Sequence, residues 1–307
     1  MIYTISLNPA LDYDVYLDSE ITSNGINHAQ NSSFRAAGKG ITVSRMLKNL
    51  GLPSVCLGFA GGFAGKFISD ELNRFGIHSN IIETAEATRI NVKINANGTE
   101  HEITGVPPCI NNDEYERFLS SLDVIKPDDY VFFSGSVSSG LPSNVYKIIS
   151  QRLPKGVKTI LDTRGNLLLE NLDENFLVKP NLGELSEAFS AEIPNKPEPI
   201  AEYAGKLIKA GAKNVIVSMG SDGAVFINGI ERIFISAHHG EVINTMGAGD
   251  SCAAGFVYAK INGMNDLQAF KTAVACGSAT AFSTEVGSKE SVERLLDING
   301  VVCYNLR

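Results

Sequence analysis

Apolar and polar positions along the chain follow two periods, and their order predicts a repeated strand–helix arrangement. Short apolar runs typical of buried strands recur at Met1–Leu7, Tyr130–Phe133 and Val215–Val217. Between such runs lie amphipathic stretches with helical spacing, for example from Gly40 to the stop signal at Gly51. Strands that alternate with helices through short loops indicate a mainly parallel sheet flanked by helices. Ligands bind such sheets at the carboxyl ends of the strands.

The pattern changes between residues 88 and 104. Apolar and polar residues alternate strictly from Ile90 to Asn95, and the following Asn97-Gly98 is a strong hairpin turn signal. We expect this hairpin to pair with the strand-like segments 12–17 and 28–34. The product would be a small sheet that stands apart from the main one.

Composition and charge narrow the functional classes. The chain has 307 residues and a formal net charge of −8, so it has no basic excess for a nucleic-acid surface. It has no apolar run long enough to span a membrane and no basic region typical of a signal peptide. The five cysteines are odd in number and form no C-x-x-C pair, which predicts reduced thiols in a cytoplasmic protein.

The stretch Asn244–Ser251 carries the strongest chemical signal. The glycines Gly247 and Gly249 form a turn that leads into an apolar helix, whose free first-turn amides and dipole make an anion site. Asp250 lies at the edge of this site, where a carboxylate can take a proton from a hydroxyl that attacks a phosphoryl group. The competing interpretation is that Asp250 is only an N-cap.

Two further helix starts have both a functional and a structural interpretation. Gly38-Lys39-Gly40 offers amides and an ammonium group to a phosphate, or is a flexible turn with a solvated lysine. Asn181 and Glu184 offer oxygens to Mg²⁺, or form a capping box for the next helix.

Other candidates are weaker when they are taken singly. Asp12 is either a ligand or a turn residue, and Arg89 is either a ligand or a solvated strand charge. The glycine-rich run Gly58–Gly65 lacks the spacing of a dinucleotide-binding loop. The five histidines show no metal-ligand spacing.

Three motifs occur together in the order of a known family. They are Ala37-Gly38-Lys39-Gly40, Lys179-Pro-Asn-Leu-Gly-Glu184 and Asn244-Thr-Met-Gly-Ala-Gly-Asp250. On these motifs the chain resembles the ribokinase-like sugar kinases of the PfkB branch over essentially its whole length. The segments Asn8–Asp12, Thr88–Lys93 and Ser134–Ser136 resemble the subgroup that uses phosphosugars.

The resemblance implies a ribokinase-like α/β fold. A mainly parallel sheet flanked by helices would form a single kinase domain over residues 1–307. The small sheet would be a lid made from about 12–35 and 88–105. In relatives this lid also forms the dimer contact, so a homodimer is implied.

The resemblance also implies a role for each candidate residue. Asp250 would be the catalytic base, and the amides of Gly247, Ala248, Gly249 and Asp250 the anion hole. Lys39 and Arg89 would meet the sugar's phosphate. The implied sugar-binding residues are Asp12, Gly38, Lys39, Arg89 and Ser136. The implied ATP-binding residues are Lys179, Asn181, Ser218, Gly220, Ser221, Gly223, Ala248 and Gly249. The implied Mg²⁺ ligands are Asn181 and Glu184.

The function implied is ATP- and Mg²⁺-dependent phosphorylation of D-fructose 1-phosphate to D-fructose 1,6-bisphosphate. Tagatose 6-phosphate and fructose 6-phosphate are the alternative substrates. Thr42 stands where relatives commonly have Asn, a position near the sugar. A catalytically silent sugar-phosphate sensor is the hypothesis from another class, and Asp250 argues against it because a sensor needs no base.

Overall fold

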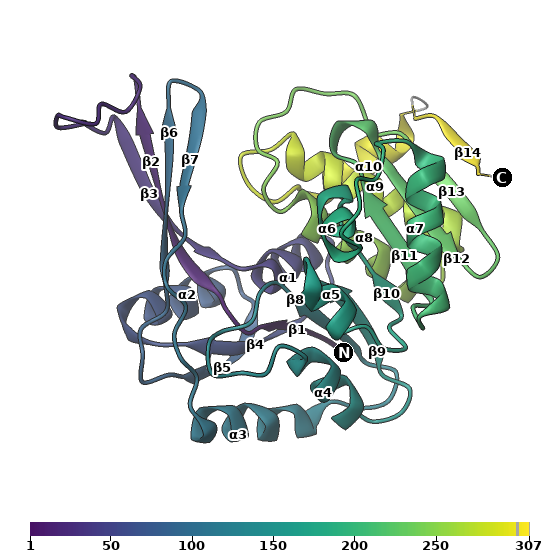
Figure 1. Cartoon of the computed structure of the whole chain (residues 1–307), viewed down its shortest axis with the longest axis horizontal. Coiled ribbons are helices and arrows are strands. Elements are labelled where there is room, and N and C mark those ends of the chain that lie inside the picture. Colours follow the sequence, from purple (N-terminus) through teal and green to yellow (C-terminus); the bar gives the residue numbers. More distant parts are fainter. Residues whose placement is uncertain (299–300, 307) are drawn as a thin grey trace.

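The computed structural model describes residues 1–298 and 301–306, and a sheet of ten strands lies at its centre (Figure 1). In the described residues the strand order is β14-β13-β12-β11-β10-β9-β8-β1-β4-β5. The seven strands from β11 to β5 in this order pair in parallel, and β12, β13 and β14 add an antiparallel edge. The predicted mainly parallel sheet is confirmed. Its strands are β1 (Ile2–Ser6), β4 (Val55–Ala60), β5 (His78–Glu83), β8 (Tyr130–Ser134), β9 (Lys158–Asp162), β10 (Leu177–Val178), β11 (Asn214–Ser218), β12 (Ala224–Asn228), β13 (Arg232–Ile235) and β14 (Cys303–Asn305).

Helices cover both faces of this sheet (Figure 1). Successive strand residues point to opposite faces, so Phe132 packs in the core under α1, α8, α9 and α10, while Phe133 packs under α3, α4, α6 and α7. No helix in the described residues is both long and apolar enough to cross a membrane. The helices are α1 (Lys39–Asn49), α2 (Gly62–Arg74), α3 (Asn112–Ser121), α4 (Val145–Arg152), α5 (Asn166–Glu170), α6 (Leu182–Ala188), α7 (Pro197–Lys209), α8 (Ala248–Ile261), α9 (Asp266–Ala281) and α10 (Lys289–Asp297), with short 3-10 turns at η1 (Leu122–Val124) and η2 (Gly220–Asp222).

Helix α8 is apolar on every side because it is buried on every side. It packs between the sheet, α1 and α9, and Phe256 lies at the centre of the aromatic cluster with Phe176 and Phe226. A Cβ atom on Gly255 would lie 2.6 Å from the Sγ of Cys276, so a glycine is required for α8 and α9 to approach this closely. This packing fixes the position of the N-terminus of α8.

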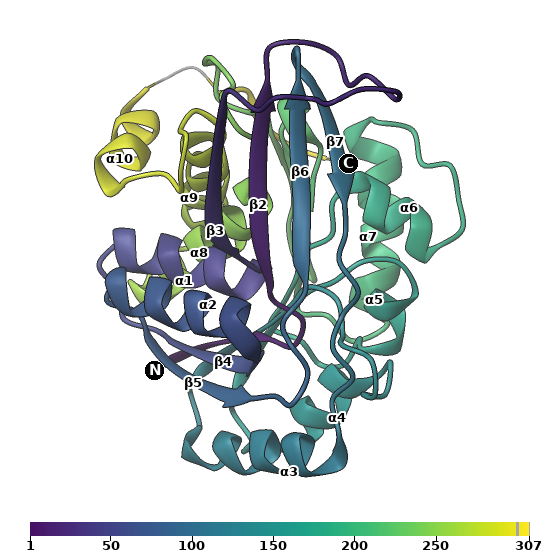
Figure 2. The ribbon, with the colours of Figure 1, turned by 90° about the vertical axis from the view of Figure 1, so that its left-hand side faces the viewer.

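A separate four-stranded sheet, which we call the lid, stands away from the main body in Figure 1 and is seen face-on in Figure 2. Its strands, in the order β3-β2-β6-β7, are β3 (Asn31–Ala37), β2 (Ala10–Leu17), β6 (Ile90–Ala96) and β7 (Thr99–Ile103). Asn97 and Gly98 both have positive φ, at 50° and 81°, as the predicted hairpin turn requires. The small sheet is confirmed, with one correction: the third predicted strand begins at Asn31 and not at His28.

Two helices are not fully evident from the sequence pattern. Helix α2 begins with glycines at Gly62 and Gly65, which serve close packing: a Cβ on Gly65 would lie 2.7 Å from the backbone of Ala60. Helix α10 was missed although it carries a usable signal, a capping Ser288 followed by the buried Val292 and Leu295.

Candidate active site

The carboxyl ends of the parallel strands open into a cleft of about 1200 Å³ that extends from the lid to α9. Every residue to which the sequence assigned a site role lines this cleft. The lining residues come from segments far apart in the chain, such as Asp12 in β2, Lys179 after β10 and Asp250 in α8. The fold therefore brings all the candidates into one site.

The N-terminus of α8 forms an anion-binding turn. Gly247 is the N-cap residue and has φ 76°, a left-handed conformation that favours glycine. Within the described part of the chain, the N–H groups of Gly247, Gly249 and Asp250 have no hydrogen-bond acceptor, whereas that of Ala248 donates to the carbonyl of Thr245 at 3.3 Å. Three of the four amides of the predicted run are thus free to bind an anion.

Asp250 is held beside these free amides. It is the third residue of α8, so the interpretation of Asp250 as the N-cap is wrong. Its side chain is 10% exposed, and its nearest cation, the Nζ atom of Lys39, is 3.8 Å away. Burial raises the pKa of Asp250 to about 7, and the nearby Asp162 and Glu184 act in the same direction against Lys39 and Lys179. A carboxylate poised near neutrality is suited to accept a proton.

Asp250 belongs to a group of charged side chains that we call the buried cluster: Lys39, Asp162, Lys179, Glu184 and Asp250. Asp162 lies at its centre, with its Oδ1 atom 2.7 Å from the Nζ of Lys39 and its Oδ2 atom 3.4 Å from the Nζ of Lys179. Burial opposes ionisation of Asp162, yet Lys179 and Lys39 together lower its pKa below the usual range. The sequence analysis missed Asp162, although a polar residue that ends a parallel strand was an available signal.

Lys39 is not a solvated lysine. Burial alone would lower its pKa, but Asp162, Asp250 and Glu184 raise it overall, so the ammonium group stays charged. The Nζ atom of Lys39 also lies 3.8 Å from Asp250. The implied role of Lys39 at the sugar's phosphate stays a prediction.

A second polar network lies at the floor of the cleft, below the lid. The guanidinium of Arg89 donates to the carbonyl of Asn8 at 3.1 Å, and the amide of Asn8 donates to the hydroxyl of Ser136 at 3.0 Å. The alternative interpretation of Arg89 as a solvated strand charge is therefore wrong. Burial lowers the pKa of Arg89, the charges of Asp12 and Glu102 oppose this, and the charge of Arg164 adds a smaller lowering effect.

This floor holds polar atoms that are buried and unpaired. Within the described residues they are the Nε atom of Arg89, the Oδ1 atom of Asn8 and the hydroxyl oxygens of Ser6, Ser134 and Thr163. A buried polar atom without a partner costs roughly 1–3 kcal/mol. Their concentration in one part of the cleft suits a ligand that offers several hydrogen-bonding groups.

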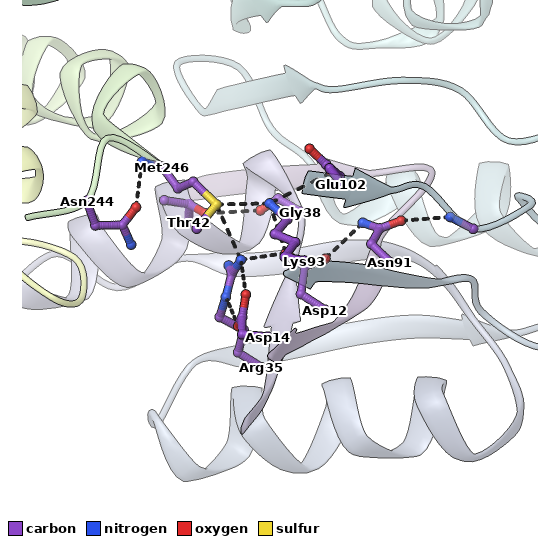
Figure 3. Close-up of polar contacts among 11 residues, drawn as sticks. Asp12, Asp14, Arg35, Gly38, Thr42, Asn91, Lys93, Glu102, Asn244 and Met246 are labelled. Atoms are coloured by element: carbon purple, nitrogen blue, oxygen red, sulfur yellow. Dashed lines mark hydrogen bonds and ion pairs between the residues drawn. The ribbon is translucent and has the colours of Figure 1, made fainter. Parts of the chain in front are cut away.

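The lid carries its own group of charges, which we call the lid cluster: Asp12, Asp14, Arg35, Lys93 and Glu102 (Figure 3). Asp12 uses both carboxylate oxygens, accepting from the amide of Asn91 at 2.8 Å and from Arg35 at 2.6 Å. It lies within strand β2, so the interpretation of Asp12 as a turn residue is wrong.

One residue of the glycine turn contacts the lid cluster. The Sδ atom of Met246 accepts from Lys93 at 2.9 Å and from Arg35 at 3.4 Å (Figure 3). The lid and the N-terminus of α8 therefore touch directly across the cleft.

The interpretation of Asn181 and Glu184 as a capping box is correct, since each side chain accepts from the other's backbone N–H at 2.8 Å. The capping hydrogen bonds use Asn181 Oδ1 and Glu184 Oε2. The other carboxylate oxygen, Glu184 Oε1, takes no part in capping and lies 3.6 Å from the Nζ atom of Lys39. In the described residues no group of three metal-ligating side chains is assembled. Of the predicted pair, Glu184 is thus the residue with an oxygen left to face a metal ion.

The far end of the cleft suits a nucleotide. Ser218, Gly220, Ser221 and Gly223 line it on the β11–β12 side, as the sequence predicted. The opposite wall, which the sequence analysis missed, is formed by His238 and by Val274, Ala281 and Phe282 of the α9 region. Apolar residues in and just after a helix carry no recognisable site signal, and apolar side chains of this kind can pack against a purine ring.

Comparison with known proteins agrees with this geometry. The sequence profile of the pfkB family carbohydrate kinases matches residues 6–292. The chain is 41% identical to the 1-phosphofructokinase of Borreliella burgdorferi and 38% identical to that of Bacillus subtilis, covering 96% of this chain and 96% and 97% of those proteins. It is 34% identical to the D-tagatose-1-phosphate kinase of Bacillus licheniformis, over 96% of this chain and 97% of that one.

A solved structure shares the fold. Phosphofructokinase-2 from Escherichia coli, in complex with substrates and products, superposes with a TM-score of 0.89 at 25% identity, covering 96% of this chain and 98% of that one. The predicted resemblance to the PfkB branch is confirmed, and with it the expectation of a sugar kinase. The chain belongs to the pfkB family of carbohydrate kinases.

Proposed function

We propose that this protein transfers the γ-phosphoryl group of ATP to the C6 hydroxyl of D-fructose 1-phosphate, forming D-fructose 1,6-bisphosphate and ADP. The observation that carries the proposal is the Asp250 carboxylate, which lies beside three unpaired amides at the N-terminus of α8. The choice of sugar is supported by the two relatives named 1-phosphofructokinase.

The proposed reaction is an in-line displacement. The oxygen of the C6 hydroxyl forms a bond to the γ-phosphorus while Asp250 accepts the proton of that hydroxyl. The bond between the γ-phosphorus and the oxygen that bridges it to the β-phosphorus breaks. ADP leaves with the electron pair. The amides of Gly249 and Asp250 and the ammonium group of Lys39 offset the negative charge of the transferred group.

The donor set near Asp250 also fits Mg²⁺, which prefers oxygen ligands and retains several waters. Glu184 lines the cleft, and its Oε1 atom, which the capping box does not use, would hold the hydrated ion. When bound with ATP, Mg²⁺ neutralises phosphate charge.

The test is a coupled ADP-release assay over a panel of ketose phosphates. We expect the highest kcat/KM for fructose 1-phosphate. Tagatose 1-phosphate is the second candidate, because one relative is named for it and its phosphate and reacting hydroxyl are in the same places. A value for it, or for tagatose 6-phosphate or fructose 6-phosphate, about tenfold above that for fructose 1-phosphate would overturn the choice of sugar.

We further propose that two copies associate through the outer face of the lid. Tyr13, Phe34, Val92 and Ile103 pair across neighbouring strands on this face, and Phe34 and Ile103 are 52% and 62% exposed. A two-sided sheet with an apolar face needs a cover. Analytical ultracentrifugation should give a dimer, and Phe34→Glu should give a monomer. A wild-type monomer at high concentration with substrate present would contradict this.

The cytoplasm is the compartment that we infer for the activity. All five cysteines are free, and three of them are buried. Such thiols are typical of a reducing compartment.

A further inference from the structure

In the described residues, six arginine and lysine side chains line the cleft. Some of them form an ion pair with a carboxylate and others do not. Lys39 and Lys179 share Asp162, while Arg35 and Lys93 share Asp12. Within the part of the chain that the structure describes, no carboxylate lies within 4 Å of Arg89 or Arg164. Neither arginine therefore forms an ion pair, although the charges of Asp12 and Glu102 act on Arg89 from farther away.

The topology places the two arginines at the same part of the cleft. Arg164 follows β9 by two residues, and β9 pairs with β8 so that Asp162 lies opposite Ser134. The N–H of Gly135 donates to the carbonyl of Asp162 at 2.9 Å, which holds the two strand ends together. From there the contacts run from Ser136 to Asn8 and on to Arg89, as described for the floor network.

Electrostatics agree with this placement. Burial is the main cause that lowers the pKa of Arg89; the charges of Asp12 and Glu102 oppose it, and the charge of Arg164 adds a smaller lowering effect. The Nε atom of Arg89 is buried and unpaired, and a second guanidinium group that lines the same cleft adds to the attraction for an anion. The guanidinium fork matches the oxygens of a phosphate.

We propose that Arg164, together with Arg89, binds the phosphate group of the sugar substrate and is a specificity-determining residue for phosphorylated sugars. The proposal rests on the proposed function and assigns the phosphate to the end of the cleft remote from Asp250. Lys39 is bonded to Asp162 and lies 3.8 Å from Asp250. Arg164 is exposed at the rim, so it can close over the phosphate after the sugar has entered.

The test compares Arg164→Ala with a matched control, Arg294→Ala, which removes an exposed arginine from α10 outside the cleft. Arg164→Ala should raise KM for fructose 1-phosphate by about 10-fold to 100-fold, the usual range for losing a charge-assisted hydrogen bond to phosphate. The kcat and the KM for ATP should stay near their wild-type values. Arg164→Lys should recover part of the loss, and thermal unfolding should verify that each variant is folded.

Calorimetric titration of the nucleotide-free protein with fructose 1-phosphate gives a second readout. Its affinity should fall in Arg164→Ala, while the weak activity on unphosphorylated fructose should not change. An unchanged KM and affinity for fructose 1-phosphate, or an equal loss with unphosphorylated fructose, would overturn the role of Arg164.

Assays of the wild-type protein test the proposed function independently of the role of Arg164. If another ketose phosphate is the preferred substrate, the same variants are compared with that sugar, and the expected rise in KM is unchanged. If the wild-type protein binds no phosphosugar at all, both proposals are wrong.

Discussion

The buried cluster and the lid cluster have the same composition, two cations and three carboxylates, yet they differ in how their charges are satisfied. In the lid cluster, both oxygens of Asp12 accept hydrogen bonds, from Asn91 and Arg35. In the buried cluster, Lys39 bonds to Asp162 and leaves Asp250 with a cation no closer than 3.8 Å.

This difference separates an organising carboxylate from a reactive one. A carboxylate whose lone pairs are occupied is held in place and orients its neighbours. A buried carboxylate without such bonds has a raised pKa and can exchange a proton with substrate. The distinction can be tested by making the same substitution at matched members of the two clusters and comparing the results. The matched pairs are Asp250 and Asp12, Lys39 and Lys93, and Glu184 and Glu102.

The largest effect is expected from Asp250→Asn. The kcat should fall by roughly 10²–10⁴, the usual contribution of a positioned base, while both substrates remain bound. Steady-state kinetics and calorimetric binding would measure the two parts. Turnover within about tenfold of wild type would show that Asp250 is not the base.

The counterpart, Asp12→Asn, should act mainly on the sugar. Loss of the charge releases Arg35 and Lys93 from their shared partner, so KM for the phosphosugar should rise by about tenfold, with a smaller change in kcat. If instead kcat fell as far as in Asp250→Asn, the two carboxylates would not differ in role.

Lys39→Met tests the electrostatic part of the comparison. In the wild type, kcat/KM should fall as the pH drops through about 7, since protonated Asp250 cannot accept a proton. Removing the Lys39 charge leaves Asp250 facing Asp162 and Glu184, which raises its pKa and moves the acidic limb to higher pH, on the order of 1 unit. A pH–rate profile measures this shift.

The control is Lys93→Met, which removes a lysine from the lid cluster and should leave the acidic limb of the pH–rate profile at its wild-type pH. An unshifted limb in Lys39→Met would mean that the group titrating near neutrality is not Asp250.

The smallest effects are expected for the third carboxylates. Glu184→Gln should raise the Mg²⁺ concentration needed for half-maximal activity without loss of stability, because Gln can still cap α6. Glu102 is 54% exposed and 3.9 Å from Lys93, so Glu102→Gln should change neither the Mg²⁺ requirement nor the stability measurably. Magnesium titrations of both variants compare them, and equal titrations would leave Glu184 with its capping role only.

The sequence by itself determined the strand–helix order, the lid hairpin and the candidates at the strand ends. These depend on short-range properties: a hydrophobic period, the turn at Asn97-Gly98, and a glycine turn before the apolar helix α8. The floor of the cleft was also within reach, since Asn8 and Ser136 follow strands whose carboxyl ends meet at one edge of the sheet.

Only the tertiary structure decided which candidates act together. Asp162 and Lys39 are 123 residues apart and meet because β9 ends and α1 begins at the same edge of the sheet. Arg164, after β9, and Arg89, before β6, likewise line one cleft only because of the fold. The pKa of Asp250 likewise depends on burial and on charges brought from four other segments, so no local pattern could predict it.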